Sequence, residues 1–323
     1  MIDHNIILFM KNKKRTFTKS LKLNGNEQIG LLITTYGAMG EVEDQAGNII
    51  RCHIRKNADS VITGDSVYWL PEKKPLSGVI VGHLPRKSLL SRTDGRKLKR
   101  VAANLDAIII VTAPSPVLSE EMVDRYLVAA ETLQIQPIIL MNKTDLLADK
   151  EKNEISNRLD VYEKIGYTIL YSSILTPDGL TELNTFLHHK TCVLVGASGV
   201  GKSSIIAKLT AESNIRVGEV SNGGLGKHTT TSTHLYHLTH GGNLIDSPGV
   251  REFGLSQMNS EEIANGFIEL KPFHNQCKFR DCLHIDEPDC AVRNAVTNHT
   301  IDARRYQSYL KLLIELNKKN KVH

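Results

Sequence analysis

The sequence has few aromatic residues, no long hydrophobic run and an odd number of cysteines. Aromatic residues make up 5% of its 323 residues, with a single tryptophan. No apolar run approaches the roughly 20 residues of a membrane-spanning helix, which argues against a membrane protein. The apolar stretch 6–10 is followed rather than preceded by basic residues, unlike a secretory signal. Five cysteines cannot all pair and three cluster late in the chain, so we expect a cytosolic protein with metal-binding thiols.

The first third of the sequence consists of short β-rich runs separated by glycine turns. Roughly five such runs between Gly30 and Leu90 predict a small β-barrel, either an OB-fold or an SH3-like barrel. Residues 1–25 are expected to be a polar, basic arm, and the basic stretch 86–100 a linker or a binding loop.

From residue 106 onward, apolar strands alternate with amphipathic helices. The run 106–112 has a continuously apolar centre at 107–111, as in a buried parallel strand, and Ser119 can cap the helix that follows. This pattern predicts a mostly parallel sheet with helices on both faces and ligands at the carboxyl ends of the strands. The expected parts are residues 1–90 with the arm and barrel, 91–258 with the α/β domain and its linker 91–103, and 259–323 with a helical zinc-binding module.

Residues 196–203 match the phosphate-binding loop G-x-x-x-x-G-K-[ST] between an apolar strand and a helix. Its backbone N–H groups can cradle phosphates, Lys202 can reach the β- and γ-phosphates, and Ser203 can bind Mg²⁺. The loop indicates a nucleoside triphosphate site without naming the base. The predicted phosphate-binding residues are Gly196, Ala197, Ser198, Gly199, Val200, Gly201, Lys202, Ser203 and Ser204.

The base is indicated by residues 142–145, which match the guanine motif N-K-x-D after a buried strand. A carboxylate at Asp145 can accept from guanine N1–H and the 2-amino group together, a donor pair that adenine lacks. In ordinary guanine-nucleotide switches this motif follows the phosphate loop, whereas here it precedes it. The sequence therefore predicts a circularly permuted GTPase that binds GTP and GDP. The predicted base-binding residues are Asn142, Lys143, Thr144, Asp145, Ser172 and Ser173.

Two segments downstream of the phosphate loop complete a GTPase pattern. Asp246 and Gly249 match D-x-x-G, in which the aspartate would hold Mg²⁺ through water and the glycine N–H would contact the γ-phosphate. A Pro-Gly turn is the alternative interpretation. Residues 222–233, here called the switch loop, are rich in glycine and hydroxyls and suit a segment that orders around γ-phosphate and Mg²⁺. The candidate magnesium ligands are Ser203, Asp246 and one of Thr229, Thr230 and Thr231.

The sequence lacks the water-orienting glutamine that Ras-type switches carry after D-x-x-G, because residue 250 is valine. His228 in the switch loop is the candidate substitute, since positioning the attacking water requires a polar group. A solvent-exposed histidine without a catalytic role is the alternative. The predicted catalytic residues are Lys202, His228, Asp246 and Gly249.

Cys277, Cys282, His284 and Cys290 have the spacing of a Cys₃His zinc site. Four protein ligands leave no open coordination position, so the zinc would be structural. His274 is an alternative fourth ligand, and a free cysteine cluster or disulfides are alternative states of the thiols. Apolar residues in 302–317 are spaced for one face of a C-terminal helix.

Positive charge is concentrated in three blocks, although the net charge is only +5. These blocks, 11–19, 86–100 and 304–321, favour a polyanionic partner such as RNA over a merely solvated surface.

The order of barrel, permuted GTPase and Cys-His module resembles the ribosome small-subunit-dependent GTPase A family over essentially the whole chain. The motifs that carry the resemblance are 142–145, 196–204, 226–231, 246–253 and 277–290. The resemblance implies an OB-fold, GTP hydrolysis with Mg²⁺ stimulated by the small ribosomal subunit, contact with its ribosomal RNA, and a role in its late maturation. We expect a monomer with one structural zinc and no membrane partner. An RNA-binding protein that holds GTP as a structural or switching ligand, or a translation-factor-like GTPase, are the alternative functions.

Overall fold

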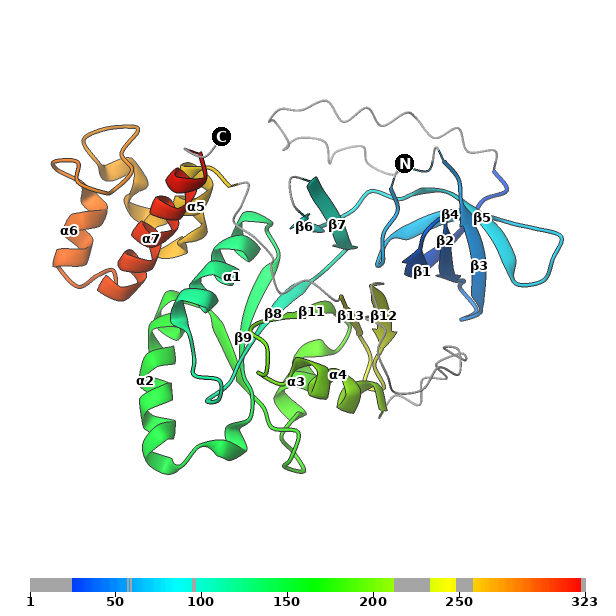
Figure 1. Ribbon diagram of the computed structural model, residues 1–323, viewed down its shortest axis with the longest axis horizontal. Helices are drawn as coiled ribbons and strands as arrows, with labels where there is room; N and C mark the ends of the chain where they lie inside the picture. The colour runs from blue at the N-terminus through cyan, green and yellow to red at the C-terminus, as the bar shows by residue number, and fades with distance from the viewer. Residues whose placement is uncertain are drawn as a thin grey trace, which may run out of the picture.

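The computed structural model describes residues 25–56, 58, 60–94, 97–211, 233–247 and 258–320. A small barrel lies on one side of the molecule, an α/β domain in the middle and a helical module on the other side (Figure 1). Within these ranges, every helix is too short or too polar to cross a membrane.

The N-terminal barrel has five strands: β1 (Gln28–Tyr36), β2 (Met39–Glu43), β3 (Ile49–Ile54), β4 (Ser66–Pro71) and β5 (Ser77–His83). They pair in the order β1-β2-β3-β5-β4, and β4 returns to β1, which closes the barrel. The five-stranded barrel is confirmed, and its strand order, with β3 pairing parallel to β5 and β4 closing on β1, is that of the predicted OB-fold. Leu32, Val67 and Trp69 belong to the barrel core, and in β4 the buried Val67 and Trp69 alternate with half-buried residues.

The segment predicted as a linker contains a β-hairpin. β6 (Leu89–Asp94) pairs antiparallel with β7 (Lys97–Ala103) between the barrel and the α/β domain. Leu90 and Ala102 are fully buried partners in this hairpin and belong to the core of the α/β domain. The density of basic residues in this stretch concealed the strands, because a hairpin with one buried face needs few apolar residues.

In the part of the α/β domain that the structure describes, the sheet has five parallel strands: β8 (Ala107–Thr112), β9 (Gln136–Met141), β10 (Thr168–Tyr171), β11 (Thr191–Val195) and β13 (Asn243–Asp246). They lie in the order β10-β9-β8-β11-β13. The antiparallel strand β12 (His234–His237) follows β13 in the sheet and also pairs with β1 of the barrel, so one sheet runs through both domains.

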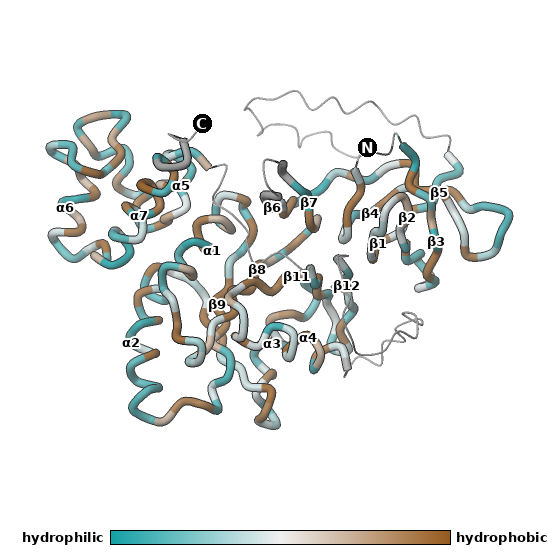
Figure 2. Tube along the Cα trace, in the orientation of Figure 1, coloured by the Kyte–Doolittle hydropathy of each residue, from teal (hydrophilic) through white to brown (hydrophobic). Residues whose placement is uncertain are grey.

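The helices of this domain are α1 (Glu120–Thr132), η1 (Thr144–Leu146), α2 (Asp149–Ile165), α3 (Thr181–Leu187) and α4 (Lys202–Ala211). They cover both faces of the sheet, which explains why its central strands are apolar throughout (Figure 2). Ile108 and Ile110 of β8 contribute to the core beneath α1 and α2, whereas Ile109 and Val111 contribute to the core beneath α3 and α4. Ser119 accepts from Met122 N at the start of α1, as predicted for a helix cap.

The C-terminal module consists of α5 (Ser260–Gly266), η3 (Ile268–Gln276), α6 (Ala291–Thr297) and α7 (Ala303–Asn320). Helix α7 confirms the amphipathic helix predicted at 302–317. It packs against α1, where Arg125 makes two hydrogen bonds of 2.7 and 2.8 Å to the carboxylate of Glu315. Helix α5 packs against α1 as well, so the module docks on the α/β domain through both α5 and α7.

Candidate nucleotide site and metal centre

The four predicted nucleotide motifs emerge at one edge of the parallel sheet. Asn142 follows β9, Ser172 follows β10, Gly196 follows β11, and Asp246 ends β13. Because these strands are parallel, their carboxyl ends lie side by side (Figure 1), where α/β sheets bind ligands. The fold thus gathers the motifs in space despite their permuted order in the chain.

The phosphate loop connects β11 to α4 through left-handed glycines. Gly196 has φ = 138° and Gly201 has φ = 99°, a region that side chains disfavour. A Cβ atom at Gly196 would collide with the carbonyl of Val111, and one at Gly201 would collide with the side chain of Asn142. The loop then enters α4 at Lys202, so it ends at a helix N-terminus, which favours phosphate.

Lys202 extends along the phosphate loop rather than into solvent. Its Nζ donates to the carbonyl oxygens of Gly196 at 2.8 Å and Ala197 at 2.6 Å. Ser203 and Ser204 occupy the first turn of α4 and are exposed. The ammonium group therefore lies on the phosphate loop, and both serines lie in the first turn of the helix that follows it.

The guanine motif is hydrogen-bonded directly to the phosphate loop. Asn142 is 2% exposed, and its Nδ2 donates to the carbonyl oxygen of Val200 at 2.8 Å. Its Oδ1 accepts from Ser172 Oγ at 3.0 Å, so the amide is fixed from two sides. Asn142 thereby holds the loops that follow β9, β10 and β11 in one arrangement.

Lys143 also contacts the phosphate loop. It adopts φ = 58°, and its Nζ donates to the carbonyl oxygens of Gly199 at 2.6 Å and Ser115 at 2.9 Å. Ser115 lies in the loop after β8, which sequence reasoning did not include in the site. Tyr126 on α1 was also missed, and the backbone of Gly196 hydrogen-bonds to its phenol. Ser115 and Tyr126 follow β8 in the sequence, and β8 lies beside β11 in the sheet. Their position after this strand was the only sign in the sequence that they lie near the phosphate loop.

The carboxylate of Asp145 is held by the serine loop after β10. Ser173 Oγ donates to Asp145 Oδ1, and Thr144 N donates to the carbonyl of Ser172 at 3.1 Å. One carboxylate oxygen is thus oriented by a hydroxyl, which suits an acceptor that must face a planar donor pair.

Asp246 closes the site on the β13 side. It ends β13 opposite His234 of β12, and β13 runs beside β11, so its carboxylate follows the strand next to the phosphate loop. Five other predicted residues, as well as Val250, lie outside the described residues. These five are His228, Thr229, Thr230, Thr231 and Gly249.

The cysteine cluster in the C-terminal module is assembled as a candidate metal centre. The ligand atoms of the four predicted residues all lie within 4.8 Å of one another. Cys277 Sγ lies 3.5 Å from His284 Nδ1 and 3.9 Å from Cys290 Sγ, and none of the three cysteines is in a disulfide. His274 stacks on His284 at 5.3 Å between ring centroids instead of joining the four. The four residues whose ligand atoms lie together are Cys277, Cys282, His284 and Cys290.

The chemistry of this donor set fits a zinc ion. Burial lowers the pKa of His284, which favours the neutral imidazole that a metal requires. Burial raises the pKa of Cys282 to about 12, so a metal ion is needed to hold this thiol as a thiolate near neutral pH. Tyr306 donates from its hydroxyl to the carbonyl of His284 at 2.6 Å and fixes the loop on α7.

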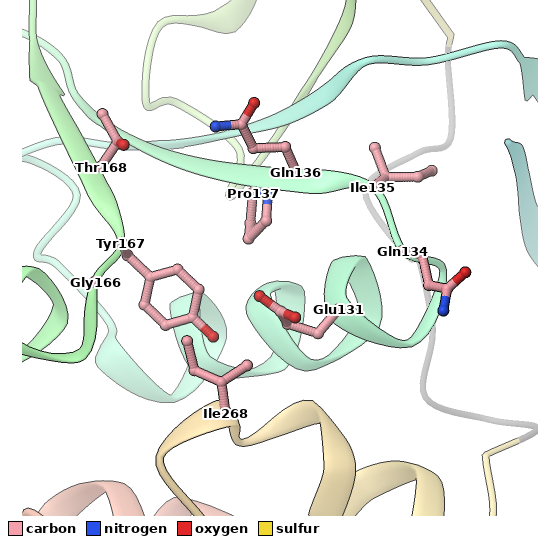
Figure 3. A pocket seen from close by; sticks show the side chains of 9 residues that line it. All are labelled: Glu131, Gln134, Ile135, Gln136, Pro137, Gly166, Tyr167, Thr168 and Ile268. Carbon is pink, nitrogen blue, oxygen red and sulfur yellow. The ribbon is translucent and has the colours of Figure 1, made fainter. Parts of the chain in front are cut away.

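A pocket of about 350 Å³ lies at the opposite edge of the sheet, at the amino ends of β9 and β10 (Figure 3). Tyr167 and Glu131 point toward each other there, and burial raises the pKa of Glu131 although Lys271 Nζ lies 3.7 Å from it. None of the lining residues belongs to a predicted motif, so this pocket is separate from the nucleotide site. They are Glu131, Gln134, Ile135, Gln136, Pro137, Gly166, Tyr167, Thr168 and Ile268.

Comparison with known proteins agrees with this arrangement. The family model described as RsgA GTPase matches residues 83–256. The chain is 44% identical over 320 residues to the small ribosomal subunit biogenesis GTPase RsgA of Haemophilus influenzae, covering 98% of this chain and 92% of that protein. It is also 44% identical over 322 residues to small ribosomal subunit biogenesis GTPase RsgA 1 of Vibrio vulnificus, and the match covers 97% of this chain and 92% of that protein.

Two solved structures share the fold. YjeQ from Thermotoga maritima matches with a TM-score of 0.75 and 32% identity over 90% of this chain and 98% of that one. YloQ, described as a circularly permuted GTPase, matches with a TM-score of 0.73 and 28% identity. The match covers 91% of this chain and 96% of the YloQ chain. With the barrel, the permuted nucleotide motifs and the Cys₃His cluster all in place, the chain belongs to the RsgA GTPase family.

Proposed function

We propose that this protein hydrolyses GTP when it binds the small ribosomal subunit, and that it thereby assists the late maturation of that subunit. The observation that carries the nucleotide part is the hydrogen bond from Asn142 Nδ2 to the carbonyl of Val200, which joins the guanine motif to the phosphate loop. The ribosomal part is supported by relatives named small ribosomal subunit biogenesis GTPase.

The proposed GTP contacts are divided between two groups of loops. Asp145, with Ser173 beside it, would accept from the guanine, and Asn142 and Lys143 would fix the base loop on the phosphate loop. Residues 196–204 would bind the phosphates through backbone N–H groups and the Lys202 ammonium. Positioning by these fixed groups supplies most of the catalysis in phosphoryl transfer.

Magnesium would be held by Ser203, Asp246 and one threonine of 229–231. The ion would neutralise charge that develops between the β- and γ-phosphates. We assign His228 to orienting the attacking water and the Gly249 N–H to the γ-phosphate. His228 is a proposal from sequence, because the position equivalent to the Ras-type glutamine is valine.

Outside the nucleotide site, we propose one structural zinc on the Cys₃His cluster and a cytosolic monomer that contacts ribosomal RNA through its basic segments. The functional parts that we propose are the barrel region 1–90, the GTPase domain 91–258 and the zinc module 259–323. The hairpin β6–β7 begins at Leu89, and its buried residues Leu90 and Ala102 join the core of the GTPase domain, so we move the proposed start of that domain from residue 91 to residue 89.

The experiment is release of phosphate from GTP, measured with purified small subunits, with large subunits and without ribosomes. We expect slow release by the protein alone and stimulation of about ten-fold or more by small subunits, which needs only about 1.4 kcal/mol of barrier. Lys202→Ala should abolish turnover, and His228→Ala should blunt the stimulated rate while GTP still binds. Stimulation should weaken steeply as salt rises, since RNA contacts release counterions.

Three results would contradict the proposal in different ways. GTP binding without any turnover would indicate an RNA-binding protein that uses GTP as a structural or switching ligand. Stimulation by large subunits alone would indicate a translation-factor-like GTPase. An unchanged rate with small subunits at low salt would leave a GTPase without the proposed ribosomal partner.

A further inference from the structure

The carbonyl oxygen of Thr233, the last residue of the switch loop, is held by two hydroxyls from the barrel. Thr34 Oγ1 donates to it at 2.8 Å, and Thr63 Oγ1 donates to it at 3.1 Å. Thr34 is 6% exposed and Thr63 is 1% exposed, so both bonds are shielded from water. A carbonyl oxygen has two lone pairs, and the barrel occupies both.

The two hydroxyls are held together by the barrel itself. The turn that contains Thr63 is joined to β1, because Gly64 N donates to Leu32 O at 2.9 Å and Leu32 N donates to Asp65 O at 2.8 Å. Asp65 is fully buried and binds the guanidinium of Arg86 at 2.6 and 2.7 Å. This network makes the threonine pair a rigid clamp rather than a pair of loose surface contacts.

Thr233 also connects the barrel to the end of β13, where Asp246 lies. Thr233 Oγ1 donates to Ser247 Oγ at 3.0 Å, and Ser247 directly follows the predicted magnesium residue Asp246. In the sheet, Thr34 of β1 pairs with His234 of β12, and His234 pairs with Asp246 of β13. Paired residues on three adjacent strands therefore connect Thr34 of the barrel to Asp246.

The clamp bears on the nucleotide site through Asp246. Because the barrel holds Thr233 O and Thr233 Oγ1 donates to Ser247 Oγ, the residue directly after Asp246 is tied to the barrel through one residue, Thr233. An aspartate that must hold Mg²⁺ in one position needs a fixed backbone, since small misplacements are costly in positioned reactions.

We propose that Thr34 and Thr63 are positioning residues for GTP hydrolysis, through which the barrel holds Thr233 and, through Thr233 and Ser247, the backbone beside Asp246. This inference rests on the proposed GTPase function. It assigns to the barrel a part in the reaction, in addition to any contact with RNA. The clamp sets the rate of the chemical step and leaves the binding of the base, at the other end of the site, unchanged.

The test compares hydroxyl removal with hydroxyl retention. Thr34→Val with Thr63→Val keeps the β-branched shape and removes both donors, whereas Thr34→Ser with Thr63→Ser keeps both donors. We expect the valine pair to lower kcat of subunit-stimulated GTP hydrolysis about ten-fold, since small misplacements are costly in positioned reactions. KM and the affinity for GDP should stay within about two-fold, and the serine pair should recover most of kcat. Thr35→Val, the next residue of β1, is the matched control and should leave kcat unchanged.

Each outcome decides the matter. A valine pair with wild-type kcat overturns the inference, and so does a serine pair as slow as the valine pair, because that result indicates packing rather than hydrogen bonding. If the double valine variant does not fold, each single variant retains one hydrogen bond and should still show a smaller loss of kcat that the matching serine recovers. Wild-type protein without GTP turnover would instead overturn the proposed function, and this inference with it.

Discussion

Arg305 Nη1 lies 2.6 Å from Asp124 Oδ1, and both side chains are fully buried. The pair joins the first helix of the GTPase domain to the last helix of the C-terminal module. Glu269 binds the other side of the guanidinium at 2.7 and 3.0 Å, and the Tyr162 hydroxyl donates to Asp124 at 2.7 Å. Every charge in this junction has a partner, as buried charges require.

Removing one charge from this junction should therefore be costly. Asp124→Asn is expected to lower the free energy of unfolding by about 3–5 kcal/mol, because Arg305 would keep its charge without its closest partner. Glu121→Gln, on the exposed side of the same helix, should change it by about 0–1 kcal/mol. Denaturant unfolding measures both. Equal effects of the two substitutions would show that the buried pair does not secure the module.

The choice of base should depend on Asp145. Asp145→Asn is expected to weaken GTP binding by about 2–3 kcal/mol, because a charged acceptor of two hydrogen bonds becomes an amide. Xanthosine triphosphate, which has a carbonyl where guanine has its amine, should bind the variant better than GTP does. Nucleotide titration of the variant, with the exposed Asp149→Asn as control, checks this. Unchanged GTP affinity would remove Asp145 from the site.

Zinc should be bound once per chain and should stabilise only the C-terminal module. Cys282→Ala is expected to release the metal and unfold that module, because metal binding supplies its folding free energy, while GDP affinity is kept. Cys52→Ala, in the barrel core, should keep the zinc. Metal analysis, limited proteolysis and GDP titration measure the three effects. A metal-free variant with an intact module would argue against a structural zinc.

The pocket at the amino ends of β9 and β10 gives a pH-dependent prediction. Burial raises the pKa of Glu131 in the folded protein, so the folded state binds this proton more tightly than the unfolded state. Its ionisation therefore destabilises the protein at neutral pH, and this destabilisation disappears as the pH falls below the unfolded pKa of about 4.3. Glu131→Gln should raise the melting temperature at pH 7 and have little effect near pH 4. Exposed Glu163→Gln is the control, and a lower melting temperature for Glu131→Gln at pH 7 would contradict the prediction.

The sequence was most informative where chemistry restricts residue type. Gly196, Gly201 and Lys202 have few substitutes in a phosphate loop, and Cys290 has few in a Cys₃His cluster, so spacing alone singled them out as candidates. The apolar run of β8 and the Ser119 cap likewise predicted buried strand and helix start correctly. These features depend on local chemistry and can be recognised without knowledge of the tertiary structure.

Contacts that depend on tertiary packing could not be predicted in the same way. The carbonyl of Ser115 reaches Lys143 only because β8 and β9 are neighbours, and any residue has a carbonyl to offer. Thr34 and Thr63 resemble ordinary strand and turn threonines until β1 is seen to pair with β12. The hairpin β6–β7 was overlooked because its basic residues resemble those of a linker.

The permuted order also determines how a pulling force would pass through the molecule. The chain enters the parallel sheet from the barrel at the start of β8 and leaves β13 toward the zinc module, and these two strands flank β11. Tension between the two outer domains would load the parallel strands from opposite ends. The hydrogen bonds that join β11 to β8 and to β13 would then be loaded in shear, so that they resist the force together. Mechanical stress from a large partner would therefore converge on the strand that carries the phosphate loop.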